Sequence, residues 1–372
     1  MLAVTPLEVL DRVRKAPATA ATPRDVLFRD GTASLYRFRG SRAPLPDRLP
    51  VLLVPSMINR WYVLDLRPGS SVAEALVEGG LDVFCLDWGI PEDEDRYMTW
   101  DEVVERLDRF ARRVRRITGA PELGVLGYCM GATLSGIYTA LKGAAGVRTL
   151  VNLAGPFDFS EAGLLGTMVD PRWFDPAAMT APGNLSPTQM QSGFVALRPP
   201  AQLAKWVGLI DKHDDDEALD AIHALETWAS DNIPFPATAY VTYIKELYQE
   251  NRLVKGEHRV GGEAVDLGRI TCPVLTVATD RDTICPLGAA RALHDRTKSP
   301  ANELFVVSGG HVGAVVGSKA RKVLYPKLVS WFRQHLLVEA PPNPGPAKKE
   351  AAPPNPAPAK KKARSTPDST PS

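Results

Sequence analysis

A cysteine between two glycines is the residue whose setting first suggests chemistry. Residues 127–131 read Gly-Tyr-Cys-Met-Gly, which is the G-x-S-x-G nucleophile elbow with cysteine in place of serine. An apolar run precedes the motif and a helix-like run follows, so we expect Cys129 at a sharp strand-to-helix turn, where a Cβ at either flanking position would clash. A helix that begins at this point directs its N–H groups at the sulfur and favours thiolate. Cys129 is therefore the candidate nucleophile; the alternative is a small buried cysteine beside a Gly-rich turn.

A nucleophile on such a turn needs a base and an orienting acid that follow later strands. Of the six histidines, His311 differs from the others because it comes just after the apolar run 304–307, in a Gly-rich loop. It is the candidate base. The acid should follow the preceding strand, where Asp280 and Asp282 are both available. We prefer Asp282, which opens a loop that leads into a helix, and we expect Asp280 to serve as a turn or cap residue.

Acyl transfer also needs two backbone N–H groups to stabilise an oxyanion. The first should belong to Met130, directly after the nucleophile. The second should come from the loop after the apolar strand 51–54, within residues 56–59, where Met57 and Ile58 are the candidates. Peptide donors leave no side-chain signature, so the sequence does not choose between these two residues.

The elements around these residues alternate between strand and helix. Apolar runs predict strands and 3.6-residue periodicity predicts helices. Such alternation is typical of a mostly parallel sheet with helices on both faces, and sheets of this kind bind ligands at the carboxyl ends of their strands. The expected strands are 32–39, 51–54, 81–88, the run before Cys129, 149–154, 273–279 and 303–307; the expected helices are 71–78, 101–117, one from the elbow to 141, 287–296 and 318–337.

The alternation is interrupted between residues 155 and 269. This stretch is rich in Met, Pro and Trp, and no strand pattern emerges from it. Amphipathic segments at 200–210, 217–228 and 238–251 indicate a mainly helical cap inserted into an α/β-hydrolase fold. The expected organisation is an N-terminal segment (1–22), the first part of the core (23–154), the cap (155–269), the second part of the core (270–338) and a disordered Pro/Ala/Lys tail (339–372).

Composition narrows the class of protein. The 372 residues are 44% hydrophobic and 23% charged, with a net charge of +1. These values are ordinary for a globular protein and give no overall positive field that would attract nucleic acid.

We find no signal-peptide pattern and no apolar run long enough to cross a membrane. The four cysteines form no disulfide framework, so a reduced, cytoplasmic protein is expected. The tail from 341 carries six basic and two acidic residues; we favour a solubilising role over contact with an acidic surface.

With these residues in hand, the sequence resembles the polyhydroxyalkanoate synthases, in particular the short catalytic subunit (PhaC) of the two-subunit class III type. The similarity covers about residues 23–336. It is carried by the following motifs: Pro-Ser-Met-Ile-Asn-Arg-Trp-Tyr-Val-Leu-Asp-Leu at 55–66, Asp-Trp-Gly-Ile-Pro at 87–91 with Asp-Arg at 95–96, the cysteine box at 127–131, Tyr-Gln-Glu-Asn-Arg-Leu at 248–253 with Gly-Gly at 261–262 and Val-Asp-Leu at 265–267, Asp-Thr-Ile-Cys-Pro at 282–286 and Ser-Gly-Gly-His-Val-Gly at 308–313.

The resemblance implies an acyltransferase that polymerises (R)-3-hydroxyacyl-CoA into polyester through an acyl-Cys129 intermediate, with His311 as base and Asp282 as third member. It implies no metal and no cofactor, since the CoA thioester is the substrate. It also implies a second synthase subunit, a possible homodimer and association with polyester granules in the cytoplasm. Three positions depart from the family pattern: Ala132 and Thr283 stand where glycine and histidine are usual, and Tyr128 is bulky.

Two other functions remain open on the sequence alone. The first is an intracellular polyester depolymerase or thioesterase of the same fold, which would release free 3-hydroxy acid. The second is a non-catalytic granule-associated protein with a vestigial site. The presence of all three triad residue types argues against the second alternative, and product analysis would separate the first from a synthase.

Overall fold

A computed structural model describes residues 17–143, 146–197 and 215–338. The expected tail (339–372) and the amphipathic segment at 200–210 lie outside these residues, as does most of the expected N-terminal segment 1–22. Within the described part of the chain, no helix is both long and apolar enough to cross a bilayer.

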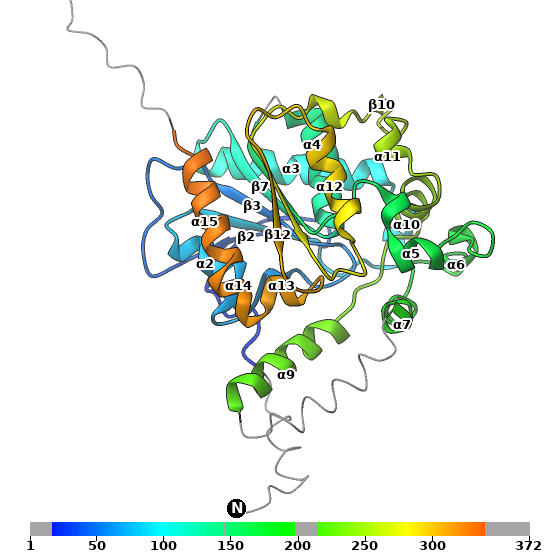
Figure 1. Cartoon of the computed structure of the whole chain (residues 1–372), viewed down its shortest axis with the longest axis horizontal. Helices are drawn as coiled ribbons and strands as arrows, with labels where there is room; N and C mark the ends of the chain where they lie inside the picture. Colours follow the sequence, from blue (N-terminus) through cyan, green and yellow to red (C-terminus); the bar gives the residue numbers. More distant parts are fainter. Residues whose placement is uncertain (1–16, 144–145, 198–214, 339–372) are drawn as a thin grey trace, which may run out of the picture. The chain divides into compact units, whose positions relative to one another are not determined.

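An eight-stranded sheet forms the centre of the molecule (Figure 1). Its spatial order is β1-β2-β6-β3-β7-β8-β11-β12; β1 and β2 pair antiparallel, as do β2 and β6, and the remaining pairs are parallel. The long parallel part carries the carboxyl ends of β3, β7, β11 and β12 to one edge. The strands are β1 (Arg24–Asp30), β2 (Ala33–Phe38), β3 (Val51–Val54), β6 (Val83–Asp87), β7 (Leu123–Tyr128), β8 (Val147–Leu153), β11 (Val274–Thr279) and β12 (Asn302–Val307).

Helices cover both faces of this sheet, as Figure 1 shows. One face packs against α3 (Trp100–Thr118), α4 (Met130–Lys142) and α12 (Leu287–Arg296), and the other against α2 (Val72–Glu78), α14 (Ser318–Lys322) and α15 (Leu324–His335). Strand β3 is buried on both sides, and its side chains alternate between the two cores: Leu52 and Val54 lie in one, Leu53 in the other. The mostly parallel sheet with helices on both faces confirms the expected α/β-hydrolase fold.

Helix α3 illustrates why the sequence folds as it does locally. Thr99 caps its N-terminus, and Glu102 completes a capping box that satisfies two free N–H groups. Apolar side chains recur at helical spacing and face the core, whereas arginines cover the outer face. Gly119, with φ +70°, ends the helix in the left-handed conformation that glycine adopts most easily.

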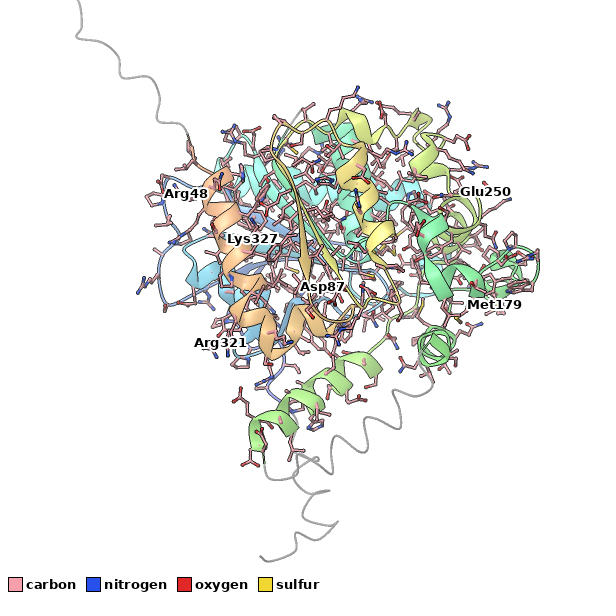
Figure 2. The ribbon with its side chains drawn as sticks, in the orientation of Figure 1. Arg48, Asp87, Met179, Glu250, Arg321 and Lys327 are labelled. Atoms are coloured by element: carbon pink, nitrogen blue, oxygen red, sulfur yellow. The ribbon has the colours of Figure 1, made fainter. Side chains whose placement is uncertain are left out.

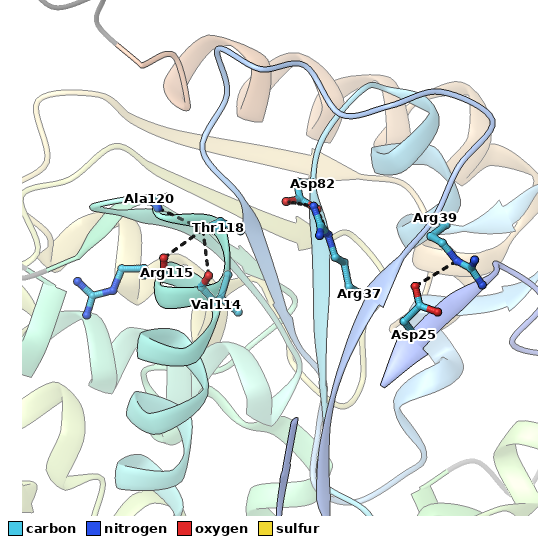
Figure 3. A network of polar contacts seen from close by, with 8 residues as sticks. All are labelled: Asp25, Arg37, Arg39, Asp82, Val114, Arg115, Thr118 and Ala120. Atoms are coloured by element: carbon cyan, nitrogen blue, oxygen red, sulfur yellow. Dashed lines mark hydrogen bonds and ion pairs between the residues drawn. The ribbon is translucent and has the colours of Figure 1, made fainter. Parts of the chain in front are cut away.

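Polar contacts fix the margins of the sheet (Figure 3). The Arg37 guanidinium on β2 donates two parallel hydrogen bonds to Asp82, which directly precedes β6, at 2.8 and 3.0 Å. Arg39 pairs with Asp25 across β1 and β2 at 3.3 Å. At the C-terminus of α3, Thr118 Oγ1 donates to the Val114 carbonyl at 2.9 Å. The two ion pairs lie on partly exposed surface, so they contribute little to stability.

Residues 155–269 form the insertion between β8 and β11. In Figure 2, Met179 and Glu250 mark the side of the molecule that it occupies. Its elements are η4 (Phe159–Glu161), α5 (Gly163–Met168), α6 (Pro176–Met179), α7 (Pro187–Leu197), α9 (Asp216–Ser230), α10 (Ala237–Thr242), the π-helical turn η5 (Tyr243–Gln249), α11 (Arg252–Lys255), β9 (Arg259–Val260), β10 (Glu263–Ala264) and η6 (Leu267–Arg269).

Three features differ from the sequence expectations. Strand β1 was not predicted, because its exposed edge position removes the alternation that marks a half-buried strand. The insertion does contain strands, since β9 and β10 form a hairpin about Gly261 and Gly262. The expected helix 318–337 is broken at Val323, because the ring of Pro326 would clash with the carbonyl four residues earlier.

Candidate active site

Cys129 lies at a strained turn between β7 and α4. Its φ of 55° and ψ of −129° are rare for a residue with a side chain, and the surrounding backbone holds it there. Its N–H donates to the Leu153 carbonyl at 3.0 Å, and its own carbonyl accepts from the Ala132 N–H at 2.9 Å. The thiol is partly exposed, and it belongs to the walls of two cavities.

The glycines of the motif are required by close backbone approach. A Cβ on Gly127 would lie 2.3 Å from Ala132 Cα, and one on Gly131 would lie 2.1 Å from the Val54 carbonyl oxygen. No side chain fits at either position. Gly131 therefore allows the loop after β3 to approach the beginning of α4 directly.

Asp282 and His311 come from neighbouring loops, after β11 and β12. His311 Nδ1 lies 2.7 Å from Asp282 Oδ2, and both side chains are buried. Asp282 Oδ1 accepts two backbone N–H groups, from Ile284 at 2.8 Å and Cys285 at 2.9 Å. Burial alone would raise the pKa of Asp282, but the hydrogen bond and charge of His311, together with these N–H groups, lower it below its usual range.

His311 connects this carboxylate to the Cys129 sulfur. Burial alone would lower the pKa of His311. The opposing effects are larger: they come from the charge and proximity of Cys129 and from the hydrogen bond and charge of Asp282. Together they raise the pKa of His311 to about 10. Nε2 is buried and makes no hydrogen bond within the described part of the chain, whereas Cys129 is close enough for its charge to raise the pKa of the imidazole. The Tyr128 ring packs beside the imidazole, with centroids 5.3 Å apart.

Asp280, the alternative carboxylate, has a different place. Its side chain is exposed, and Oδ1 accepts the Gly309 N–H at 2.8 Å. The Arg281 N–H donates to the Gly309 carbonyl at 3.1 Å in the same loop. Asp280 therefore holds the loop that carries His311 without touching the imidazole, whereas Asp282 contacts it.

The candidate oxyanion donors come from the beginning of α4 and from the loop after β3. Met130 is the first residue of α4, so its N–H has no intrahelical acceptor. In the loop after β3, the Ile58 N–H donates to Ser56 Oγ at 3.1 Å. The Met57 N–H makes no hydrogen bond within the described residues. Of the two candidates in this loop, Met57 is thus the one with a free donor.

The C-terminal end of α9 holds this loop at several points. The Ile233 N–H donates to the Ile58 carbonyl at 3.3 Å, and Trp228 Nε1 donates to the Arg60 carbonyl at 2.9 Å. Tyr62 adds a hydrogen bond to Asp231 at 2.8 Å. A segment of the insertion therefore fixes the conformation of the loop that carries Met57.

Three side-chain amides extend this connection, and we call them the amide relay: Asn59, Asn232 and Gln191. Asn59 Nδ2 donates to Asn232 Oδ1, and Asn232 Nδ2 donates to Gln191 Oε1 on α7. Asn59 and Gln191 also line a cavity beside Cys129. Sequence analysis did not find the relay, because single amides distant in sequence leave no periodic signal.

Two cavities meet at the sulfur, and Cys129, Ile58 and Ile284 line both. The first, of about 460 Å³, also contacts His311 and the amide relay and has a mixed lining. The second, of about 360 Å³, extends under the insertion and is mainly apolar. Residues of the first cavity include Ser56, Asn59, Tyr128, Gln191, Glu226, Trp228 and His311; those of the second include Phe174, Met179, Met190, Gly193, Phe235, Tyr243 and Tyr248.

The three positions that depart from the family pattern have separate surroundings. The Ala132 methyl group packs closely against Gly155, where an added Cβ would lie only 2.4 Å from it. Thr283 is exposed beside Asp282. Tyr128 is buried with its hydroxyl unpartnered in the described part of the chain. None of the three displaces Cys129, Asp282 or His311.

No group of three or more His, Cys, Asp or Glu side chains in the described ranges is arranged to hold a metal ion. That the protein needs no metal or cofactor stays a prediction from the sequence.

Comparison with known proteins relates this geometry to a family. The family model for the alpha/beta hydrolase fold matches residues 50–318, and the model for the poly-beta-hydroxybutyrate polymerase (PhaC) N-terminus matches residues 15–76. The poly(3-hydroxyalkanoate) polymerase subunit PhaC of Allochromatium vinosum is 32% identical, over 85% of this chain and 90% of that protein. The chain belongs to the PhaC family. The resemblance seen in the sequence motifs is thereby confirmed, and PhaC proteins are named as polymerases, which are acyltransferases.

Other relatives carry the same name. The PhaC subunit of Haloferax mediterranei is 32% identical over 84% of this chain, and the chain spans 64% of that protein's length. The PhaC subunit of Synechocystis is 30% identical over 84% of this chain and 85% of that protein. Among solved structures, a proposed non-heme bromoperoxidase (BpoC) of Mycobacterium tuberculosis is similar, with a TM-score of 0.51 at 14% identity, over 83% of this chain and 97% of that one. At that identity the likeness shows the fold alone.

Proposed function

We propose that this chain polymerises (R)-3-hydroxyacyl-CoA thioesters into polyhydroxyalkanoate and releases CoA. The observation that carries the proposal is the position of the Cys129 sulfur, at the junction of two cavities and beside the His311–Asp282 pair, in a member of the PhaC family. In this proposal Cys129 is the nucleophile, His311 the base and Asp282 the residue that orients the imidazole.

The first half-reaction forms an acyl-enzyme. The Cys129 thiol gives its proton to His311 Nε2, and the sulfur attacks the thioester carbonyl carbon. Negative charge develops on the carbonyl oxygen, where the N–H groups of Met130 and Met57 stabilise it. The bond to the CoA sulfur then breaks, and CoA leaves with the proton from the imidazolium. A 3-hydroxyacyl group remains on Cys129 as a new thioester.

The second half-reaction extends the polyester. The 3-hydroxyl of another acyl unit gives its proton to His311 Nε2, and its oxygen attacks the acyl carbon on Cys129. An oxoester bond forms as the carbon–sulfur bond breaks, and the proton returns from His311 to the Cys129 sulfur. Asp282 holds Nδ1 throughout, at 2.7 Å, so that Nε2 faces the reacting atoms.

Cysteine suits this reaction because it preserves the activation of the acyl group. Exchange of one thioester for another is nearly balanced in free energy, and transfer to a hydroxyl is then downhill. A serine would use that driving force in the first step and hold a less reactive ester. Hydrolysis is avoided only where water is excluded, and the insertion over the apolar cavity supports that role.

The same proposal extends to partners and location. The relatives are named as subunits, which supports a second synthase subunit beside this chain, and a homodimer is proposed with it. The growing polyester implies attachment to the surface of a cytoplasmic granule. Nucleic acid is not a proposed partner, because the net charge of +1 provides no basic field.

Replacement of the nucleophile tests the function. Purified Cys129→Ala should release no detectable CoA from 3-hydroxybutyryl-CoA, and should form no insoluble polyester, because no acyl-enzyme can form. Cys272→Ala is the matched control: this cysteine lines a separate cleft that contains none of the three site residues. It should keep wild-type turnover. Near-normal turnover by Cys129→Ala would overturn the mechanism, and free 3-hydroxy acid as the main wild-type product would assign a hydrolase instead.

A further inference from the structure

The apolar cavity beside Cys129 has no charged group in its described lining. It measures about 360 Å³ and is bounded by aliphatic, methionine and aromatic side chains from the insertion. The phenols that contribute to it remain neutral; burial raises the pKa of Tyr240 to about 12, for example. An uncharged, mainly apolar wall suits the hydrocarbon part of an acyl group and not the phosphates of CoA.

Helix α7 contributes one face to this cavity. Gln189, Met190, Gly193 and Ala196 line it, which is the spacing of a single helical stripe. The centre of that stripe is Gly193, where an added Cβ would have no atom of the described residues within 4 Å. Glycine lowers the stability of a helix interior, so it does not stabilise α7 at this position. Its effect here is to leave open volume in the cavity.

The size of the cavity exceeds what a short acyl group needs. A volume of about 360 Å³ lies in the range that holds drug-sized ligands. The 3-hydroxybutyryl group ends in a single methyl beyond its hydroxyl-bearing carbon and would leave most of this space empty. Met179 and Met190, on the cavity wall, have unbranched side chains that adapt to ligands of different length. Figure 2 labels Met179 on the insertion.

We propose that this cavity binds the side chain of medium-length (R)-3-hydroxyacyl groups, such as 3-hydroxyoctanoyl, and that the absence of a side chain at Gly193 sets the length accepted. The inference rests on the proposed function, because it assigns the substrate class of the same site. Gly193 acts here as a specificity-determining residue. It lies on the cavity wall and is separate from Cys129, Asp282 and His311, which carry the chemistry.

Steady-state kinetics of Gly193→Phe test the proposal. The release of CoA from 3-hydroxybutyryl-CoA and 3-hydroxyoctanoyl-CoA would be measured for both proteins. The wild type should use the longer thioester with a kcat/KM at least equal to that for the shorter one. In Gly193→Phe the ring should fill the cavity and lower kcat/KM for 3-hydroxyoctanoyl-CoA at least ~10-fold, since a single methylene in such a pocket changes it 10-fold or more. The value for 3-hydroxybutyryl-CoA should fall less, so that the ratio of the two kcat/KM values shifts toward the shorter substrate, and far-UV circular dichroism would check the folding of the variant.

Gly193→Ala is the matched control. It adds the smallest side chain and should retain most of the activity toward both substrates. An equal loss on both substrates in Gly193→Phe would overturn the proposal and indicate that the cavity holds growing polyester. Wild-type activity with 3-hydroxybutyryl-CoA alone would also overturn it, while leaving the proposed function intact. Activity with neither thioester would count against the function itself.

Discussion

Cys129 and Asp282 both act on the pKa of His311. The charges of Cys129 and Asp282, together with the hydrogen bond to Asp282, outweigh burial and raise the pKa of His311 to about 10, which makes the imidazole a stronger base toward the Cys129 proton. A protonated imidazole beside a cysteine is the arrangement that activates thiol nucleophiles. Burial instead raises the pKa of the Cys85, Cys272 and Cys285 thiols, which keeps them protonated. The four cysteines should therefore differ strongly in reactivity.

The Asp282→Asn variant tests this dependence. The substitution removes a negative charge that favours the imidazolium, so the pKa of His311 should fall and the imidazole should take the Cys129 proton less readily. The rate of Cys129 alkylation by iodoacetamide at pH 7 should drop at least ~10-fold, because a neighbouring opposite charge shifts a pKa by about one unit or more. Peptide mapping by mass spectrometry would identify the modified cysteine.

Asp280→Asn is the control for this experiment. Asp280 caps the same loop through the Gly309 N–H and does not contact the imidazole. An asparagine oxygen can accept the same hydrogen bond, so the alkylation rate should remain within about twofold of wild type. An unchanged rate in Asp282→Asn, or an equal fall in both variants, would contradict the assigned role of Asp282.

At the scale of elements, the loop after β3 is positioned by the insertion. Helix α9 ends against this loop, and the amide relay continues the contact to α7. Met57, whose N–H is free, lies between Ser56 and the residues that the insertion holds. Any change in the position of α9 is thus transmitted to a candidate oxyanion donor. Asn232 is the middle member of the amide relay, because it accepts from Asn59 and donates to Gln191.

Asn232→Ala should therefore affect turnover more than binding. Loss of the amide frees Asn59 and loosens the loop, which should misplace the Met57 N–H in the transition state. We expect kcat to fall ~10-fold, less than the 100-fold or more for deletion of an oxyanion donor, with KM changed less than about threefold. Gln191→Ala breaks only the outer contact of the relay and should have a smaller effect on kcat. Equal kcat losses in the two variants would assign the effect to α7 and not to the loop.

The sequence predicted those elements whose signals are local. Cys129, Asp282 and His311 were expected to lie near one another because each follows an apolar strand, and parallel strands bring their carboxyl ends to the same edge. The amide relay was missed because its members are far apart in sequence and belong to no periodic pattern. The break at Val323 had a signal, Pro326, that helical periodicity concealed.

The hairpin of β9 and β10 likewise had a signal in its Gly-Gly turn. It was missed because its two strands are too short to show the alternation of apolar and polar residues that marks a strand. The choice between Met57 and Ile58 could not be made from sequence, because it depends on which N–H the Ser56 hydroxyl accepts. Side-chain identity carries no information about that choice.

At the scale of the whole molecule, one residue links the beginning of the insertion to its end. Asn251, near the end, adopts a left-handed conformation with φ 51°. Its Oδ1 accepts the Phe159 N–H at 2.9 Å, and its Nδ2 donates to Asp158 Oδ1 at 2.8 Å, both just after β8. The loop that leaves the sheet at β8 is therefore tied to the segment that precedes β9. This contact should couple unfolding of the insertion to unfolding of the sheet.

Asn251→Ala and Asn251→Gly separate the two contributions of this residue. Both variants lose the two hydrogen bonds, one of which involves a carboxylate, so the free energy of unfolding should fall by about 2–4 kcal/mol. Alanine must also adopt a positive φ, which should cost about 1 kcal/mol more than glycine does. Urea unfolding followed by tryptophan fluorescence and by far-UV circular dichroism would measure both differences. Wild-type stability in Asn251→Ala would show that the insertion is held by its apolar contacts alone. An equal fall in the free energy of unfolding of the two variants would show that backbone strain at this position contributes nothing.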